Sequence, residues 1–112
     1  MNKEIRPWGS FEVLMEAPYY TVKMLEVKPG ECLSLQLHRR RSEHWFVVAG
    51  SGLATIDSEI TSLYHGHSID IPKGSMHRVK NSSEENLIII EVQTGECYED
   101  DIERFEDKYG RI

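Results

Sequence analysis

Cysteine is scarce in this sequence, and long apolar runs are missing from it. The two cysteines, Cys32 and Cys97, lie far apart and form no CxxC or CxxH pair, which argues against a disulfide framework and a cysteine-based zinc site. No apolar run approaches the roughly 20 residues that cross a membrane, and the first residues, MNKEIRPWG, lack the apolar segment of a signal peptide. We therefore expect a cytoplasmic protein with two reduced thiols in or near its core.

Basic residues are in the minority as well. The 13 Lys and Arg face 19 Asp and Glu, which gives a formal net charge of -6. Because such a charge repels phosphate backbones and anionic lipids, we expect neither nucleic acid nor a membrane as the partner. Any bound phosphate group must then be held by a local cluster of basic residues. The 112 residues, 39% of them hydrophobic, suffice for a single domain over residues 1–112 with one modest core.

What the sequence does contain is a series of short apolar or alternating runs, separated by Gly, Pro, Asn and Ser about every ten residues, as is typical of all-β proteins. The expected strands cover residues 9–14, 20–27, 32–38, 43–49, 52–56, 60–64, 68–71, 76–80 and 87–93. Between two of them, Lys28-Pro29-Gly30-Glu31 has Pro and Gly at the second and third positions of a turn. This many short strands in a small domain predict a sandwich or a small barrel.

The C-terminal tail has a different pattern. Asp100 and Asp101 precede Ile102, Phe105 and Tyr109, which are spaced three and four residues apart. This spacing predicts a short helix over about residues 99–109, with an apolar stripe and an acidic first turn that suits the helix dipole. We expect this helix to pack against a barrel formed by about residues 9–95.

The stretch QLHRRRSEHW, residues 36–45, combines metal-ligand side chains with three arginines. Side chains alternate between the faces of a strand, so Gln36 and His38 share one face, and Glu43 shares a face with Trp45. If residues 32–38 and 43–49 pair as an antiparallel hairpin, an amide oxygen, an imidazole and a carboxylate converge inside the barrel. This donor set suits a divalent cation such as Zn, Fe, Mn or Co.

Two spaced motifs extend this interpretation. The first is formed by Gly30, Gln36, His38, Glu43 and Gly50, and the second by Gly66, Pro72, Gly74, His77 and Asn81. Both resemble the motifs of the cupin superfamily, with Gln36 where the family often has its first His. The resemblance implies an all-β fold, the double-stranded β-helix or jelly-roll barrel of the cupins. It also implies a metal site made of Gln36, His38, Glu43 and His77.

Further segments resemble the isomerase domain of type II phosphomannose isomerases. They are RPWG (6–9), VKPG (27–30), LSLQ (33–36), EHW (43–45), IEVQTG (90–95), EDDIER (99–104) and YGR (109–111). In that family the domain usually ends a bifunctional enzyme whose first part is a mannose-1-phosphate guanylyltransferase. The resemblance implies interconversion of mannose 6-phosphate and fructose 6-phosphate through an enediol. Because the sequence has no GxGTRLWP-like segment, we do not expect it to make GDP-mannose by itself.

The resemblance also implies a set of cofactor and catalytic groups. We expect one divalent ion, Zn²⁺ in the first place and Co²⁺, Mn²⁺, Ni²⁺ or Fe²⁺ as alternatives, and a hexose phosphate as substrate. Arg41 is the first choice for the substrate phosphate because the family motif has an Arg two positions before the Glu. Other candidates for the phosphate are Arg39, Arg40, Arg78, Arg104 and Arg111. The catalytic base stays open among Lys28, Glu91, Asp70 and His67, and we carry Lys28 and Glu91 forward as catalytic residues beside Arg41.

Simpler readings and other functions compete with this one. In the simpler interpretation the arginines form only a solvated turn, Glu43 pairs with one of them, and Gln36 is a structural amide. The alternative functions are another metal-dependent cupin enzyme, such as an oxygenase, and a non-catalytic sugar-binding module that acts with a separate guanylyltransferase. An exposed edge strand in so small a domain favours a homodimer.

Overall fold

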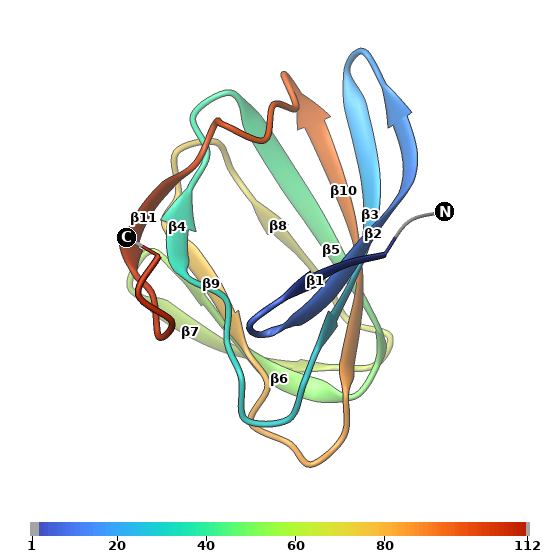
Figure 1. Ribbon diagram of the computed structural model, residues 1–112, viewed down its shortest axis with the longest axis vertical. Helices are drawn as coiled ribbons and strands as arrows, with labels where there is room; N and C mark the ends of the chain where they lie inside the picture. Colours follow the sequence, from blue (N-terminus) through green and yellow to red (C-terminus); the bar gives the residue numbers. More distant parts are fainter. Residues whose placement is uncertain (1–2, 112) are drawn as a thin grey trace.

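The computed structural model describes residues 3–111, which form eleven strands in two antiparallel sheets and contain no helix. The six-stranded sheet has the order β1 (Lys3–Arg6), β2 (Gly9–Ala17), β3 (Tyr20–Val27), β10 (Leu87–Gly95), β5 (Arg41–Ala49) and β8 (Ser68–Ile71). The five-stranded sheet has the order β11 (Glu103–Glu106), β4 (Leu35–Leu37), β9 (His77–Lys80), β6 (Ser51–Ile56) and β7 (Glu59–Tyr64). The sheets face each other and enclose a barrel (Figure 1). Over these residues no helix could span a membrane.

The strands expected from the sequence are all present, so the all-β prediction is confirmed. Residues 32–38 give only the short strand β4, and the polar strand β1 was not expected. The predicted turn forms: the N–H of Glu31 donates to the carbonyl of Lys28 at 3.1 Å, and Gly30 has a φ of 78°. Cys32 and Cys97 are free and partly buried.

The expected hairpin between residues 32–38 and 43–49 is wrong. β4 pairs with β9 and β11, whereas β5 pairs with β10 and β8, so the two strands lie in different sheets. The arginine segment between them crosses from one sheet to the other. The inward side chains still meet because both strands face the barrel interior.

The expected C-terminal helix is wrong too. Residues 103–106 form β11, which pairs with β4 and places Arg104 opposite Gln36. Without β11, one edge of β4 would keep its peptide groups unpaired, and pairing them outweighs the helical spacing of the tail. In Figure 1 the red C-terminal segment leaves the end of β10, crosses the open end of the barrel and runs down beside β4.

Three neighbouring strands show how the barrel interior is divided. Inward residues change from polar to apolar along β3 (Thr21, Lys23, Leu25, Val27), β10 (Gln93, Glu91, Ile89, Leu87) and β5 (Arg41, Glu43, Trp45, Val47). The register aligns these changes, since Glu91 lies opposite both Lys23 and Trp45, and Ile89 lies opposite Leu25 and Val47. One end of the barrel is therefore an apolar core, and the other end is polar. Trp8 and Trp45 are both buried in the core.

Candidate metal centre

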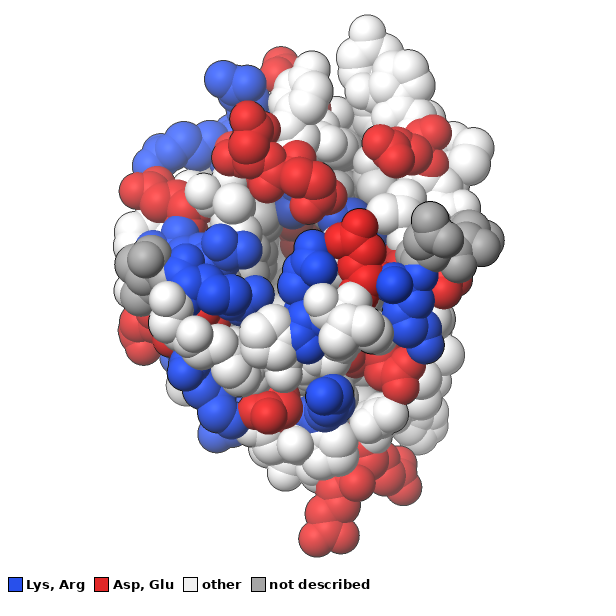
Figure 2. Space-filling view, viewed as in Figure 1, with Lys and Arg blue, Asp and Glu red and all other residues white. Residues whose placement is uncertain are grey.

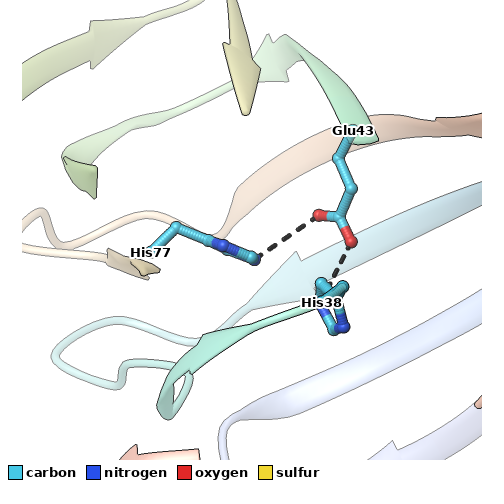
Figure 3. A group of neighbouring side chains, drawn as sticks. All are labelled: His38, Glu43 and His77. Atoms are coloured by element: carbon cyan, nitrogen blue, oxygen red, sulfur yellow. Dashed lines mark ion pairs between the residues drawn. The ribbon is translucent and has the colours of Figure 1, made fainter. Parts of the chain in front are cut away.

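The polar end of the barrel contains a compact cluster of two histidines and one glutamate. His38 follows β4, His77 begins β9 and Glu43 lies on β5 of the facing sheet, and all three are buried. Nε2 of His38 is 3.2 Å from Oε2 of Glu43, and Nε2 of His77 is 3.7 Å from Oε1 of Glu43. Figure 3 shows the three side chains pointing toward one another from three strands. The three residues lie together as expected from the two motifs, although the expected pairing of residues 32–38 with 43–49 is wrong.

The backbone determines which nitrogen of each imidazole faces Glu43. Nδ1 of His38 lies 2.6 Å from the carbonyl oxygen of Asp101, and Nδ1 of His77 lies 3.0 Å from that of Ser75. A carbonyl only accepts, so both Nδ1 atoms carry the proton and both Nε2 atoms present a lone pair. Metal-bound histidines usually donate their second ring N–H in this way.

The electrostatics keep both imidazoles neutral. Burial, followed by the charge of Arg41, lowers the pKa of His38 to about 4. Burial also lowers the pKa of His77. Two imidazole lone pairs and the Glu43 carboxylate therefore face one another as acceptors, with the Arg41 guanidinium as a cationic partner on one side. A cation bound between the three would offset the repulsion that remains among them.

The spacing and chemistry of these donors fit a metal ion. The three ligand atoms lie within 4.8 Å of one another. Ligands at about 2.1 Å from a shared tetrahedral ion are about 3.4 Å apart, close to the observed contacts. Two neutral imidazoles and a carboxylate match the donor set of Zn and of neighbouring divalent metals.

Gln36 lies next to this cluster, but its side-chain amide nitrogen donates to Ser34 and not to the cluster. It is buried on β4, directly opposite His77 in the β4–β9 pair. Its Nε2 donates to the carbonyl and the hydroxyl of Ser34, at 3.3 and 3.2 Å, which leaves the amide oxygen available for an ion. The position suits the fourth ligand that the resemblance implies.

Arg41 and Trp45 hold the carboxylate in place. Arg41 Nε donates to Glu43 Oε2 at 3.0 Å, and Trp45 Nε1 donates to Glu43 Oε1 at 3.0 Å. The other nitrogens of Arg41 contact His38 Nε2 at 3.2 Å and the carbonyl of Tyr98 at 3.3 Å. All the nitrogens of this buried guanidinium thus have acceptors in the protein. A substrate phosphate at Arg41 would have to displace one of them.

Glu91 is the second carboxyl group of the site. It accepts hydrogen bonds from Trp45 at 3.1 Å and from Gln93 at 2.9 Å. Burial, and then the nearby charge of Glu43, raise the pKa of Glu91 to about 8. Because Trp45 donates to both carboxyl groups, the indole fixes Glu91 beside the metal cluster.

The structure separates the remaining base candidates from the site. Lys28 is exposed near the turn that follows β3 and does not line the polar cavity. Asp70 and His67 are exposed as well, and Asp70 pairs with His44 at the surface. Of the four candidates, only Glu91 lies with the metal cluster.

Among the arginine candidates, Arg39 and Arg40 are exposed outside this cavity, while Arg78, Arg104 and Arg111 line it. Lys23 also lines it and was missed by the sequence analysis. This lysine is buried on β3 opposite Glu91. The available signal was a lysine within the predicted strand 20–27, although both faces of that strand carry apolar residues.

The chain is similar to several known proteins. Residues 1–107 match the family model for the mannose-6-phosphate isomerase C-terminal domain. The alginate biosynthesis protein AlgA of Pseudomonas syringae pv. tomato is 50% identical over 107 residues, covering 95% of this chain and 22% of the relative. The mannose-1-phosphate guanylyltransferase ManC of Salmonella typhimurium is 46% identical over 114 residues, covering 100% of this chain and 24% of the relative. The chain thus spans about a quarter of the length of these relatives.

The fold has relatives among solved structures. An uncharacterized protein with a double-stranded β-helix domain from Klebsiella pneumoniae superposes with a TM-score of 0.75 at 21% identity, covering 85% of this chain and 82% of that one. Because the family match extends through all the strands described above and through every residue of the metal cluster, the chain belongs to the mannose-6-phosphate isomerase C-terminal family and has the cupin fold.

Proposed function

We propose that this chain is a metal-dependent isomerase that interconverts mannose 6-phosphate and fructose 6-phosphate. The observation that supports it most is the His38–Glu43–His77 cluster with Glu91 beside it, in a cavity lined by basic residues. Membership of the mannose-6-phosphate isomerase C-terminal family supports this choice of substrate. The reaction needs a divalent ion, a group that moves a proton between two carbons, and a cation for the phosphate.

His38, Glu43 and His77, with the amide oxygen of Gln36, would hold the ion. Zn²⁺ is our first choice, and Co²⁺, Mn²⁺, Ni²⁺ and Fe²⁺ share the preference for these donors. When bound, such an ion supplies Lewis-acid polarisation of the sugar oxygens. The protein's part is to keep both imidazoles neutral by burying them, and to orient them through the carbonyls of Asp101 and Ser75.

Glu91 is our candidate for the proton transfer. The reaction removes a proton from C2 of the aldose and returns it to C1, so one group must accept and then donate it. A carboxyl group with a pKa of about 8 exchanges its proton readily near neutral pH. The contacts from Trp45 and Gln93 fix its two oxygens, and hence the position from which it reaches a substrate.

A second function, a non-catalytic sugar-binding module, is favoured by one observation. The relatives are about four times longer than this chain, and ManC is named as a guanylyltransferase. Such a module would bind the sugar phosphate and show no turnover. The two functions therefore differ in a single measurement.

That measurement is a coupled assay of fructose 6-phosphate formation from mannose 6-phosphate by the purified chain. We expect activity that is lost with a chelator and restored by one of Zn²⁺, Co²⁺, Mn²⁺ or Ni²⁺. Glu91→Gln should lower kcat by at least about 100-fold, the usual contribution of a positioned acid or base. The exposed pair His44–Asp70 provides the control variant Asp70→Asn, which should leave kcat unchanged. Absence of turnover with all four metals would reject the isomerase.

A further inference from the structure

A buried lysine of the cavity has an exposed partner. Nζ of Lys23 contacts Oε1 of Glu99 at 2.5 Å, and the side chain of Lys23 is 6% exposed, whereas that of Glu99 is 72% exposed. Lys23 lies on β3, and Glu99 lies in the segment that crosses the open end of the barrel. The cation is therefore fixed to the barrel wall, while its carboxylate partner is in contact with water.

Other basic groups surround the same carboxylate. Burial alone would raise the pKa of Glu99, but the hydrogen bond from Lys23 and the charges of Lys23, Arg41 and Arg6 lower it. Lys23 and Arg6 also lie over the ring of Phe11, with their charged atoms 4.6 and 4.8 Å from its centre. Figure 2 shows Lys and Arg side chains on two sides of a hollow on this face of the molecule, with Asp and Glu side chains along its upper edge. The carboxylate of Glu99 thus marks a position that favours an anion.

This position is easier to vacate than the two ion pairs of the cavity whose carboxylates are buried. Arg41 binds Glu43, whose side chain is 1% exposed, and Arg111 binds Asp107, whose side chain is fully buried. Separating either pair would leave a buried carboxylate without its partner, which is costly. Glu99, by contrast, is already largely hydrated, and an ion pair with one exposed member contributes little to stability.

We propose that the carboxylate of Glu99 occupies the subsite for the phosphate group of a phosphorylated sugar, and that Lys23 is the cation that binds this phosphate. Glu99 is then an internal competitor that leaves when substrate enters. The inference rests on the proposed isomerase function for the identity of the sugar. A phosphate at Lys23 would be next to Glu91, because the two residues are opposite each other on β3 and β10.

A purely structural role for the pair gives a different expectation. If Lys23 and Glu99 only fasten the tail to the barrel, removing the carboxylate loosens the site and weakens or leaves unchanged the binding of phosphate. If Glu99 competes with phosphate, removing its charge strengthens binding. The sign of the change in affinity therefore separates the two roles.

The experiment measures binding of inorganic phosphate and of mannose 6-phosphate to the full chain by NMR titration, with a chelator present so that no metal binds the probes. For Glu99→Gln we expect about 3- to 10-fold tighter binding of both probes, since an exposed ion pair no longer has to be broken and one negative charge is gone. For Lys23→Met we expect binding at least about 10-fold weaker, the loss of one charge-assisted hydrogen bond. Unphosphorylated mannose should bind all variants equally.

The Lys108–Glu31 ion pair, outside the cavity, is the matched control. Lys108→Met and Glu31→Gln should change the affinity for neither probe. The inference is overturned if wild type does not bind the probes, if Lys23→Met binds as wild type does, or if Glu99→Gln binds more weakly. Lys23-dependent binding in a chain that does not isomerise the sugar would keep the subsite and reject the isomerase. If Lys23→Met turns over the sugar with an unchanged KM, the isomerase is kept and the phosphate subsite at Lys23 is rejected.

Discussion

Two buried groups at the candidate metal centre have pKa values shifted in opposite senses, and this predicts opposite effects on the stability of the metal-free protein. Burial and the charge of Arg41 lower the pKa of His38 from 6.5 to about 4. Burial and the charge of Glu43 raise the pKa of Glu91 from 4.5 to about 8. Both side chains are more than nine-tenths buried, so solvent screens these shifts little.

The sign of each effect follows from which state binds the proton. Between pH 6.5 and about 4, His38 is protonated in the unfolded chain only, so its contribution to stability falls as the pH falls. Between pH 4.5 and about 8, Glu91 is protonated in the folded chain only, so its contribution falls as the pH rises. Each group changes the slope of the unfolding free energy by one proton, or about 1.4 kcal/mol per pH unit. Over the shared range of pH 4.5–6.5 this gives about 3 kcal/mol in opposite directions.

Urea unfolding of His38→Gln and Glu91→Gln in a chelating buffer, from pH 4.5 to 6.5, tests this. Relative to wild type, the unfolding free energy of His38→Gln should rise less steeply with pH. That of Glu91→Gln should rise more steeply. The remaining titratable groups are common to the three proteins, so their contributions largely cancel in the comparison. Equal slopes in all proteins, or two shifts of the same sign, would refute the assignment of a neutral histidine and a protonated glutamate.

Two further predictions concern the metal ligands and the tail. His38→Ala and His77→Ala should each reduce bound metal from about one ion per chain to near zero by elemental analysis, with an unchanged far-UV circular dichroism spectrum; full metal content would remove the ligand assignment. Asp101→Ala removes a carboxylate that accepts two backbone N–H groups of the arginine segment at 3.0 and 2.9 Å, and it should lower the unfolding free energy by about 1–2 kcal/mol in urea. The exposed neighbour gives the control Asp100→Ala, for which a loss as large would contradict the role of these two contacts.

The alternation of residues along single strands was enough to predict most of the barrel and the inward side chains of the site. Glu43, Trp45 and Val47 are buried at every second position of β5, as a strand with one face inward requires. Metal-ligand side chains at such positions can only meet inside the barrel. This is why Gln36, His38 and Glu43 were expected to meet inside the barrel, whereas His77 was added by the resemblance to the second cupin motif.

The choice of strand partners could not be predicted in the same way. β4 and β5 are close in sequence, which favours a hairpin, but each finds its neighbours in a different sheet. In the tail, Ile102, Phe105 and Tyr109 fit a helix by spacing alone. The structure instead uses the alternation in β11, where Arg104 is less exposed than Glu103 and Phe105, because β4 offers an unpaired edge. Both errors come from long-range pairing, which local patterns do not encode.

Lys23 was overlooked for a related reason. In β3, both faces carry apolar residues, so the strand pattern does not say which face is inward. Glu91 stood out in its apolar strand, but its neighbour across the sheet is known only from the register. Once β3 and β10 are paired, the buried Lys23 and the buried Glu91 lie opposite each other, so each unusual charge has an oppositely charged neighbour.

Residues 98–101, which follow β10, form part of the candidate site. Buried polar and charged groups in so small a domain are costly unless each has a partner. Three of those partners come from the segment that follows β10: the carboxylate of Glu99 for Lys23, the carbonyl of Tyr98 for Arg41 and the carbonyl of Asp101 for His38. The apolar end of the barrel depends on none of these contacts, because its core residues lie on the inward rows of both sheets. Loss of these three contacts should therefore affect metal and substrate binding before it affects the packing of the apolar core.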